Sequence, residues 1–126
     1  MLNKEVIRKW ADALRSGKYV QCTGSLFNEE LGAHCCLGVL CEVAEENGIK
    51  IESMDWRRYG VLLPSEVADW AGLHSIDPIL GDMPNGERLT ATAANDSLQW
   101  SFDKIADVIE EKYLGGPNSD TTSTRE

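Results

Sequence analysis

The stretch His34–Cys41, with the sequence HCCLGVLC, decides the fold that we expect for this chain. From Cys35 onward no residue of the stretch is charged, and Gly38 is the only break in the run of apolar side chains. A helix that is apolar on every side belongs in the interior of a protein, where neighbouring elements cover all its faces. The sequence therefore predicts a buried central helix around which the rest of the chain is organised.

This central helix is predicted to begin near Cys35 or Cys36 and to continue to Glu46, because Asn47-Gly48 supplies a left-handed stop. The glutamates of its second half are expected to face solvent. Gly38 has no side chain, so it indicates the place where another segment of backbone comes close to the helix.

Two amphipathic helices are predicted near the ends of the chain. Asn3 and Ser101 are the expected N-caps, and Gly17 is expected to end the first helix. Apolar residues recur at helical spacing in both segments, as Val6, Ile7, Trp10, Ala13 and Leu14 and as Phe102, Ile105, Ala106, Ile109 and Tyr113.

Shorter elements complete the expected fold. Residues 18–23 alternate in a way that predicts a strand, and Asn85-Gly86 predicts a hairpin turn between residues 79–80 and 88–90. Ser65 is expected to cap a short helix that ends at Gly72. The predicted fold class is α+β, with the central buried helix packed under the amphipathic N- and C-terminal helices and beside a small antiparallel sheet.

The chain of 126 residues is long enough for one domain with its own core. We expect residues 1–115 to form a single globular domain and residues 116–126 to be a disordered polar tail. No stretch approaches the roughly 20 apolar residues of a membrane helix, and residues 1–4 lead directly into an amphipathic pattern. The sequence therefore predicts a soluble, cytoplasmic protein without a membrane partner.

The formal net charge of -9 is unevenly distributed. Residues 1–25 carry five cations and two anions, so residues 26–126 hold seven cations against nineteen anions. Phosphate backbones are bound by local positive charge. We therefore expect no direct binding of duplex nucleic acid, and the acidity by itself favours solubility.

The four cysteines allow three readings, and buried reduced thiols are the one we favour. Structural zinc normally uses pairs of ligands two to four residues apart, whereas Cys35 and Cys36 are adjacent and the chain has no C-x-x-C motif. A cysteine nucleophile would need a lowered pKa and a base, for which His34 is the sequence neighbour. We expect no metal, no cofactor and no catalytic residue, with a cysteine-centred enzyme or metal-binding protein as the alternative.

Two polar groups are candidate ligand-binding residues. Trp56, Arg57, Arg58 and Tyr59 combine aromatic rings with cations, as protein interfaces and phosphate sites often do. Asn95-Asp96 lies shortly before the predicted Ser101 cap, near a helix N-terminus. The structural alternatives are a surface loop over the core for the first group and an Asx turn for Asn95 and Asp96.

Several phrases of the sequence together resemble a group of small uncharacterised proteins of tailed bacteriophages and prophages. The resemblance covers most of the chain except the tail, and it implies a phage origin and a bacterial cytoplasm, but no activity and no catalytic residue. It is carried by residues 10–19 (WADALRSGKY), 35–41 (CCLGVLC), Leu63-Pro64, Val67, 70–73 (WAGL), Asn95-Asp96, Ser101-Phe102 and 105–110 (IADVIE).

The functional prediction is a non-catalytic phage accessory protein that acts by binding in the host bacterial cytoplasm. Its partner would be a host protein of a defence or regulatory system, or a small nucleotide-like ligand, and a homo-oligomer is possible. Small size, acidity and the absence of local catalytic motifs favour this prediction over an enzyme. A virion or assembly component is a further alternative.

Overall fold

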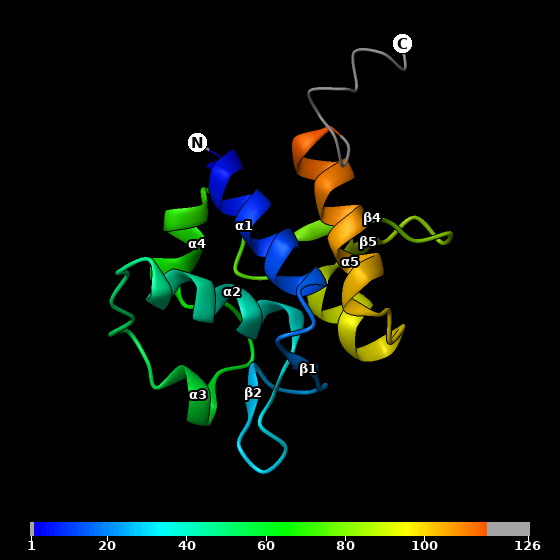
Figure 1. Cartoon of the computed structure of the whole chain (residues 1–126). Helices are drawn as coiled ribbons and strands as arrows, with labels where there is room; N and C mark the ends of the chain where they lie inside the picture. Colours follow the sequence, from blue (N-terminus) through cyan, green and yellow to red (C-terminus); the bar gives the residue numbers. More distant parts are fainter. Residues whose placement is uncertain (1, 116–126) are drawn as a thin grey trace.

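Helix α2, Cys36–Glu46, lies at the centre of the fold (Figure 1), in a computed structural model that describes residues 2–115. Every residue from Cys36 to Cys41 is buried, and Val43 and Ala44 continue the buried surface. The helix ends at Asn47, and Gly48 follows in the left-handed conformation with φ +86°. The predicted central buried helix and its limits are confirmed.

The N-terminal helix covers α2, and the C-terminal helix packs mainly against the N-terminal one. Helix α1, Lys4–Arg15, packs against α2, α4 and α5, and runs beside α5, Phe102–Ile109 (Figure 1). A π-helical segment, η2 (Glu110–Leu114), continues α5. Both predicted caps are present, because the backbone N–H groups of Val6 and Lys104 donate to the side chains of Asn3 and Ser101.

Polar contacts fix the position of α1 over the core. The indole of the fully buried Trp10 donates to the carbonyl oxygen of Cys36, 2.9 Å away, at the start of α2. The guanidinium of Arg15 donates to both oxygens of the buried Glu110 carboxylate, at 2.9 and 2.8 Å. A buried carboxylate needs such a partner, since an unpaired charge in the interior costs several kcal/mol.

The α+β class is confirmed, but only one of the two sheets is purely antiparallel. The first contains β1 (Val20–Gln21), β2 (Phe27–Asn28) and β3 (Ala33–His34) in the order β1-β3-β2. Strand β1 is parallel to β3, and β2 is antiparallel to β3. The second is the predicted hairpin, in which β4 (Ile79–Asp82) pairs with β5 (Arg88–Thr90).

Three short helical segments connect these parts. Helix α3, Trp56–Tyr59, lies in a segment for which the sequence suggested a loop. Helix α4, Ser65–Ala71, ends at Gly72 as predicted, but Pro64 holds the cap position expected for Ser65. The π-helical segment η1, Ala93–Ser97, replaces the suggested turn before α5.

Gly38 contacts the backbone of Leu26, as its position in the apolar helix predicted. A Cβ atom added to Gly38 would overlap the Leu26 carbonyl oxygen and lie 2.8 Å from the carbonyl carbon. The same oxygen accepts a hydrogen bond from the Cys35 N–H, 3.1 Å away. The segment that leads into β2 therefore lies directly on the first turn of α2.

Across residues 2–115, the structure has no helix that is both long enough and apolar enough to span a membrane. The predicted tail, residues 116–126, lies outside the described residues. The single domain expected for residues 1–115 stays a prediction.

Candidate functional site

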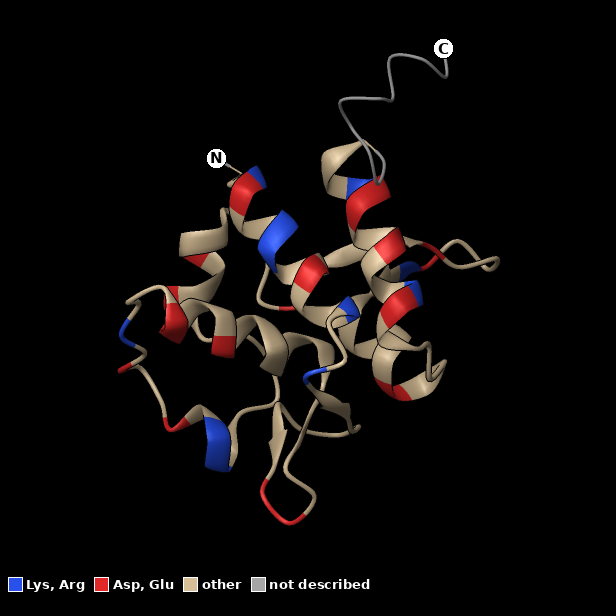
Figure 2. Cartoon of the chain, in the orientation of Figure 1, with Lys and Arg blue, Asp and Glu red and all other residues tan. Residues whose placement is uncertain are grey.

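Arg57 on α3 is held by two glutamates of α2. Its guanidinium donates to Glu42 Oε1 at 2.7 Å and to Glu45 Oε1 at 2.9 Å, and it lies 4.3 Å from the centre of the Trp56 ring. Burial lowers the pKa of Arg57, but the hydrogen bond to Glu45 and the charge of Glu42 outweigh it, so the pKa is raised. Figure 2 shows the acidic residues of α2 and the basic residues of α3 on the same side of the fold. The charge of Arg57 is thus largely neutralised within the molecule.

The ion pairs of Arg57 with Glu42 and Glu45 are connected to the first sheet through His34. His34 Nε2 lies 2.8 Å from Glu42 Oε2, and the imidazole ring contacts the rings of Phe27 and Tyr19 at centroid distances of 4.8 and 5.1 Å. Trp56 is 3% exposed, and its indole N–H donates to Glu45 Oε2 at 3.0 Å. Glu42 and Glu45 therefore connect α2 to α3 and β3, although Glu45 is exposed, as the sequence predicts, and Glu42 is half-buried.

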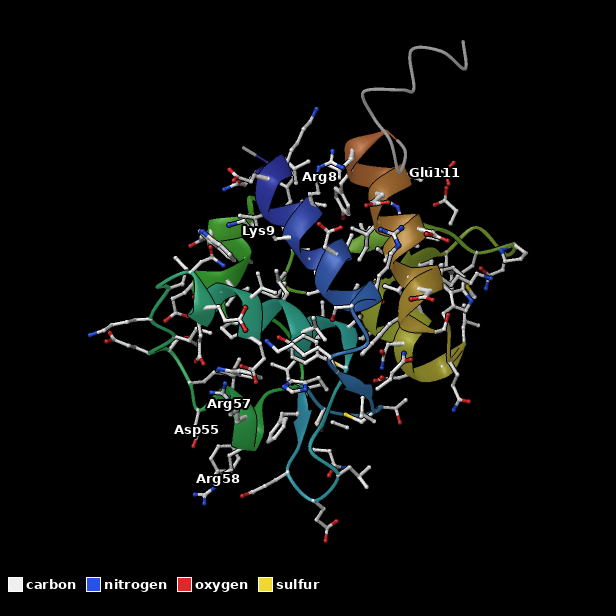
Figure 3. All side chains as sticks on the ribbon, in the orientation of Figure 1. Arg8, Lys9, Asp55, Arg57, Arg58 and Glu111 are labelled. Atoms are coloured by element: carbon white, nitrogen blue, oxygen red, sulfur yellow. The ribbon has the colours of Figure 1, made fainter. Side chains whose placement is uncertain are left out.

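Arg58 and Tyr59 remain available at the outer side of α3. The Tyr59 side chain is 71% exposed, and the Arg58 guanidinium lies 6.0 Å from the centre of its ring. Figure 3 shows Arg58 pointing away from α2, at the end of α3 farthest from the core. The predicted group of four residues is therefore divided into Trp56 and Arg57, which contact the glutamates of α2, and Arg58 and Tyr59, which point to solvent.

A cavity of about 310 Å³ lies between α3 and β2. Phe27, Glu29, Asp55, Arg57 and Arg58 line it. Two carboxylates thus accompany the two arginines, and Arg57 is already paired with Glu42 and Glu45. Phosphate groups are bound where several cations are free to donate to them, so this cavity is poorly suited to a nucleotide phosphate.

Asn95 is used inside the fold. It is 1% exposed, and its Oδ1 accepts from the Cys36 N–H at 3.2 Å and from Gln21 Nε2 at 2.9 Å. Its Nδ2 donates to the Cys22 carbonyl oxygen at 2.8 Å and to Asp96 Oδ1 at 2.7 Å. The amide of Asn95 therefore joins η1 to the start of α2 and to the chain after β1.

Asn95 also lines a second, more polar cavity of about 410 Å³, together with Gln99. Gln99 is the one non-glycine residue in the described part of the chain with a positive φ, +54°. Successive residues of a strand point to opposite faces, and Phe27 lines the α3 cavity whereas Asn28 lines this one. Arg57 and Arg58 therefore line one cavity and Asn95 lines the other, and a ligand role for Asn95 and Asp96 stays a prediction.

The four cysteines are buried and unpaired. Burial raises the pKa of the Cys35 thiol to about 12, and burial likewise raises the pKa values of Cys22, Cys36 and Cys41. A thiolate is the reactive form of cysteine, so none of these environments activates a nucleophile. Within residues 2–115, no three His, Cys, Asp or Glu side chains come together in a way that could hold a metal ion.

Thiol labelling checks the chemistry of these cysteines. We expect all four to react with a disulfide reagent in denaturant, and none to react rapidly in the folded protein at pH 8. Raising the thiol pKa from 9.0 to about 12 lowers the thiolate population of Cys35 about a thousandfold at that pH. Cys22, which lines the second cavity, should be the first to react as the pH is raised. A thiol that reacted at neutral pH as fast as free cysteine would instead favour cysteine-centred chemistry.

Comparison with known proteins identifies the family of this chain. No curated protein and no solved structure matches the chain. The family that does match is described as a domain of unknown function, and this description contains no activity and no link to bacteriophages. Its model matches residues 2–113, which is nearly the whole described chain, and the protein therefore belongs to the DUF8296 family.

Proposed function

We propose that this protein is a non-catalytic accessory protein of a bacteriophage that binds a host protein in the bacterial cytoplasm and so counters a defence or regulatory component. The observation that carries the binding role is the surface formed by Asp55, Arg58, Tyr59 and Val61, here called the α3 face. Tyr59 and Val61 are 71% and 51% exposed, and Asp55 and Arg58 are also exposed. The phage origin depends on the sequence resemblance alone.

The α3 face has the composition and the support of a protein-binding surface. Tyrosine and arginine are enriched among residues that contribute most to interfaces. The buried Trp56 anchors the short helix from below, and the Leu26 side chain packs against Gly60 at its end. Because the backbone that carries these side chains is already fixed, binding costs little backbone entropy, which favours affinity.

A protein partner fits this surface better than a nucleotide-like ligand. Arg57 is neutralised by Glu42 and Glu45, and the adjoining cavity contains the carboxylates of Glu29 and Asp55. A phosphate placed there would meet about as much negative as positive charge. A protein surface can satisfy cations and carboxylates together, because interfaces place charges of both signs opposite one another.

Site-specific cross-linking tests the proposal. A photoreactive amino acid at position 59 should cross-link one host protein in the bacterium, whereas the same group at the exposed position 50 should not. The double variant Arg58→Ala, Tyr59→Ala should lower the affinity for that protein about thirtyfold. Both side chains are exposed, so the unfolding midpoint should not change.

Three outcomes would contradict the proposal. These are identical cross-links from positions 59 and 50, an affinity unchanged by the double variant, and a cross-linked partner that is a phage structural protein. The last result would favour a virion or assembly component.

A further inference from the structure

A third cavity, of about 330 Å³, lies far from the α3 face. Its walls come from the residue before the α1 cap, the segment after α4, β4, β5 and η2, whereas α3 lies at the bottom of Figure 1. Most of this wall is apolar, and it is formed by Leu2, Leu73, Pro78, Ile79 and Tyr113. The volume is at the lower end of the range of about 300–1,000 Å³ that is typical of ligand sites.

Two cations meet at this cavity. Arg88 from β5 and Lys112 from η2 line it, together with the exposed His74. Neither the Arg88 nor the Lys112 side chain makes an ion pair or hydrogen bond with any other residue in the range 2–115. In a chain with a net charge of -9, two unpaired cations beside an apolar cavity form an unusual local environment.

The π-helical turn contributes to this arrangement. Segment η2 supplies both Lys112 and Tyr113 to the cavity. The Tyr113 hydroxyl donates to the Ile79 carbonyl oxygen at 2.7 Å, so the ring is held as a wall between η2 and β4. Single π-helical turns are rare and occur frequently at functional sites.

We propose that this cavity binds a small organic monoanion with an apolar body. The acid group lies between Arg88 and Lys112, and the body lies against Leu73, Ile79 and Tyr113. Charge complementarity supports an anion, since the cavity lining includes Arg88 and Lys112 and no carboxylate. Asp82, opposite Arg88 in the hairpin, lines only the adjoining cavity of about 260 Å³. A monoanion fits better than a phosphate, because most of the wall offers no hydrogen-bond donor.

Nuclear magnetic resonance titration of the full chain tests this proposal. The probes are phenylacetate and isovalerate, with phenylacetamide as the uncharged analogue of the first. We expect saturable shifts at the backbone amides of residues 73–75, 79 and 112–113 with at least one of the anions. Phenylacetamide should bind about tenfold more weakly than phenylacetate where phenylacetate binds, because it cannot pair with Arg88 and Lys112.

Matched charge variants separate local pairing from the overall charge of the protein. Arg88→Gln with Lys112→Gln should weaken binding of the anion about tenfold, whereas Lys50→Gln with Lys104→Gln should have no effect. Both pairs lower the net charge equally and alter exposed side chains. No saturable shift with either anion would overturn the proposal, as would equal binding of phenylacetamide and phenylacetate or an equal loss in both double variants.

Discussion

Replacing Gly38 by alanine is expected to destabilise the protein by about 3 kcal/mol, at the upper end of the usual cost of overpacking. Helix propensity alone predicts the opposite sign, because alanine stabilises a helix interior by about 1 kcal/mol relative to glycine. The structure favours the overpacking cost over the gain in helix propensity, since an added Cβ would overlap the Leu26 carbonyl oxygen. That oxygen also accepts from Cys35 N–H, so moving Leu26 away would break a hydrogen bond at the start of α2.

Gly81→Ala is the matched control for this prediction. Gly81 lies in β4, and a Cβ atom there would have no neighbour within 4 Å. We expect its free energy of unfolding to stay within about 0.5 kcal/mol of the parent protein. The free energies of unfolding of Gly38→Ala and Gly81→Ala are both measured by urea unfolding followed by circular dichroism. A Gly38→Ala protein as stable as the parent would show that the contact with Leu26 does not constrain the fold.

The sequence predicted best the elements whose signals are local. An unbroken apolar run placed α2 inside the protein, and Gly38 within it indicated the close backbone contact with Leu26. The caps Asn3 and Ser101 fixed the starts of α1 and α5. Each of these predictions depends on residues within a few positions of one another, where propensity, capping and periodicity act.

The mixed sheet and the ion pairs of Arg57 depend on distant residues, and the sequence did not predict them. Strand β1 is two residues long, and its parallel pairing with β3 is formed through tertiary packing that no local pattern specifies. Arg57 is neutralised by Glu42 and Glu45, which precede it by 15 and 12 positions. A pattern of arginines and aromatic residues cannot reveal which of its members already have partners.

The candidate sites illustrate the same limit. Arg88 and Lys112 are 24 positions apart, and neither belongs to a motif, so no sequence pattern indicated that they meet at one cavity. The sequence predicts that Asn95 lies near the N-terminus of the helix capped by Ser101. The helix that it contacts is α2, however, and not the following α5. A substitution that removes some of the hydrogen bonds of Asn95 tests whether this residue has a structural role.

Asn95→Asp is expected to destabilise the protein by about 2–3 kcal/mol at neutral pH. The change keeps the shape of the side chain and its acceptor contacts with Cys36 N–H and Gln21 Nε2. It replaces the donor facing the Cys22 carbonyl oxygen and the Asp96 carboxylate with an acceptor. The introduced oxygen would then face both the Cys22 carbonyl oxygen and the Asp96 carboxylate oxygen in a buried site, where repulsion is poorly screened.

The pH dependence and a matched variant test this explanation for Asn95→Asp. Protonation makes the introduced carboxyl group a donor again, so the difference from the parent protein should shrink as the pH falls. Asn28→Asp is the control. Among the described residues, the Asn28 side chain is used as an acceptor, because its Oδ1 accepts from the Leu31 N–H at 3.0 Å, and the substitution preserves that role. We expect it to change the free energy of unfolding by less than about 0.5 kcal/mol. If Asn95→Asp matched this control at every pH, the amide donor would be dispensable to the fold, and Asn95 would again be a candidate for ligand binding.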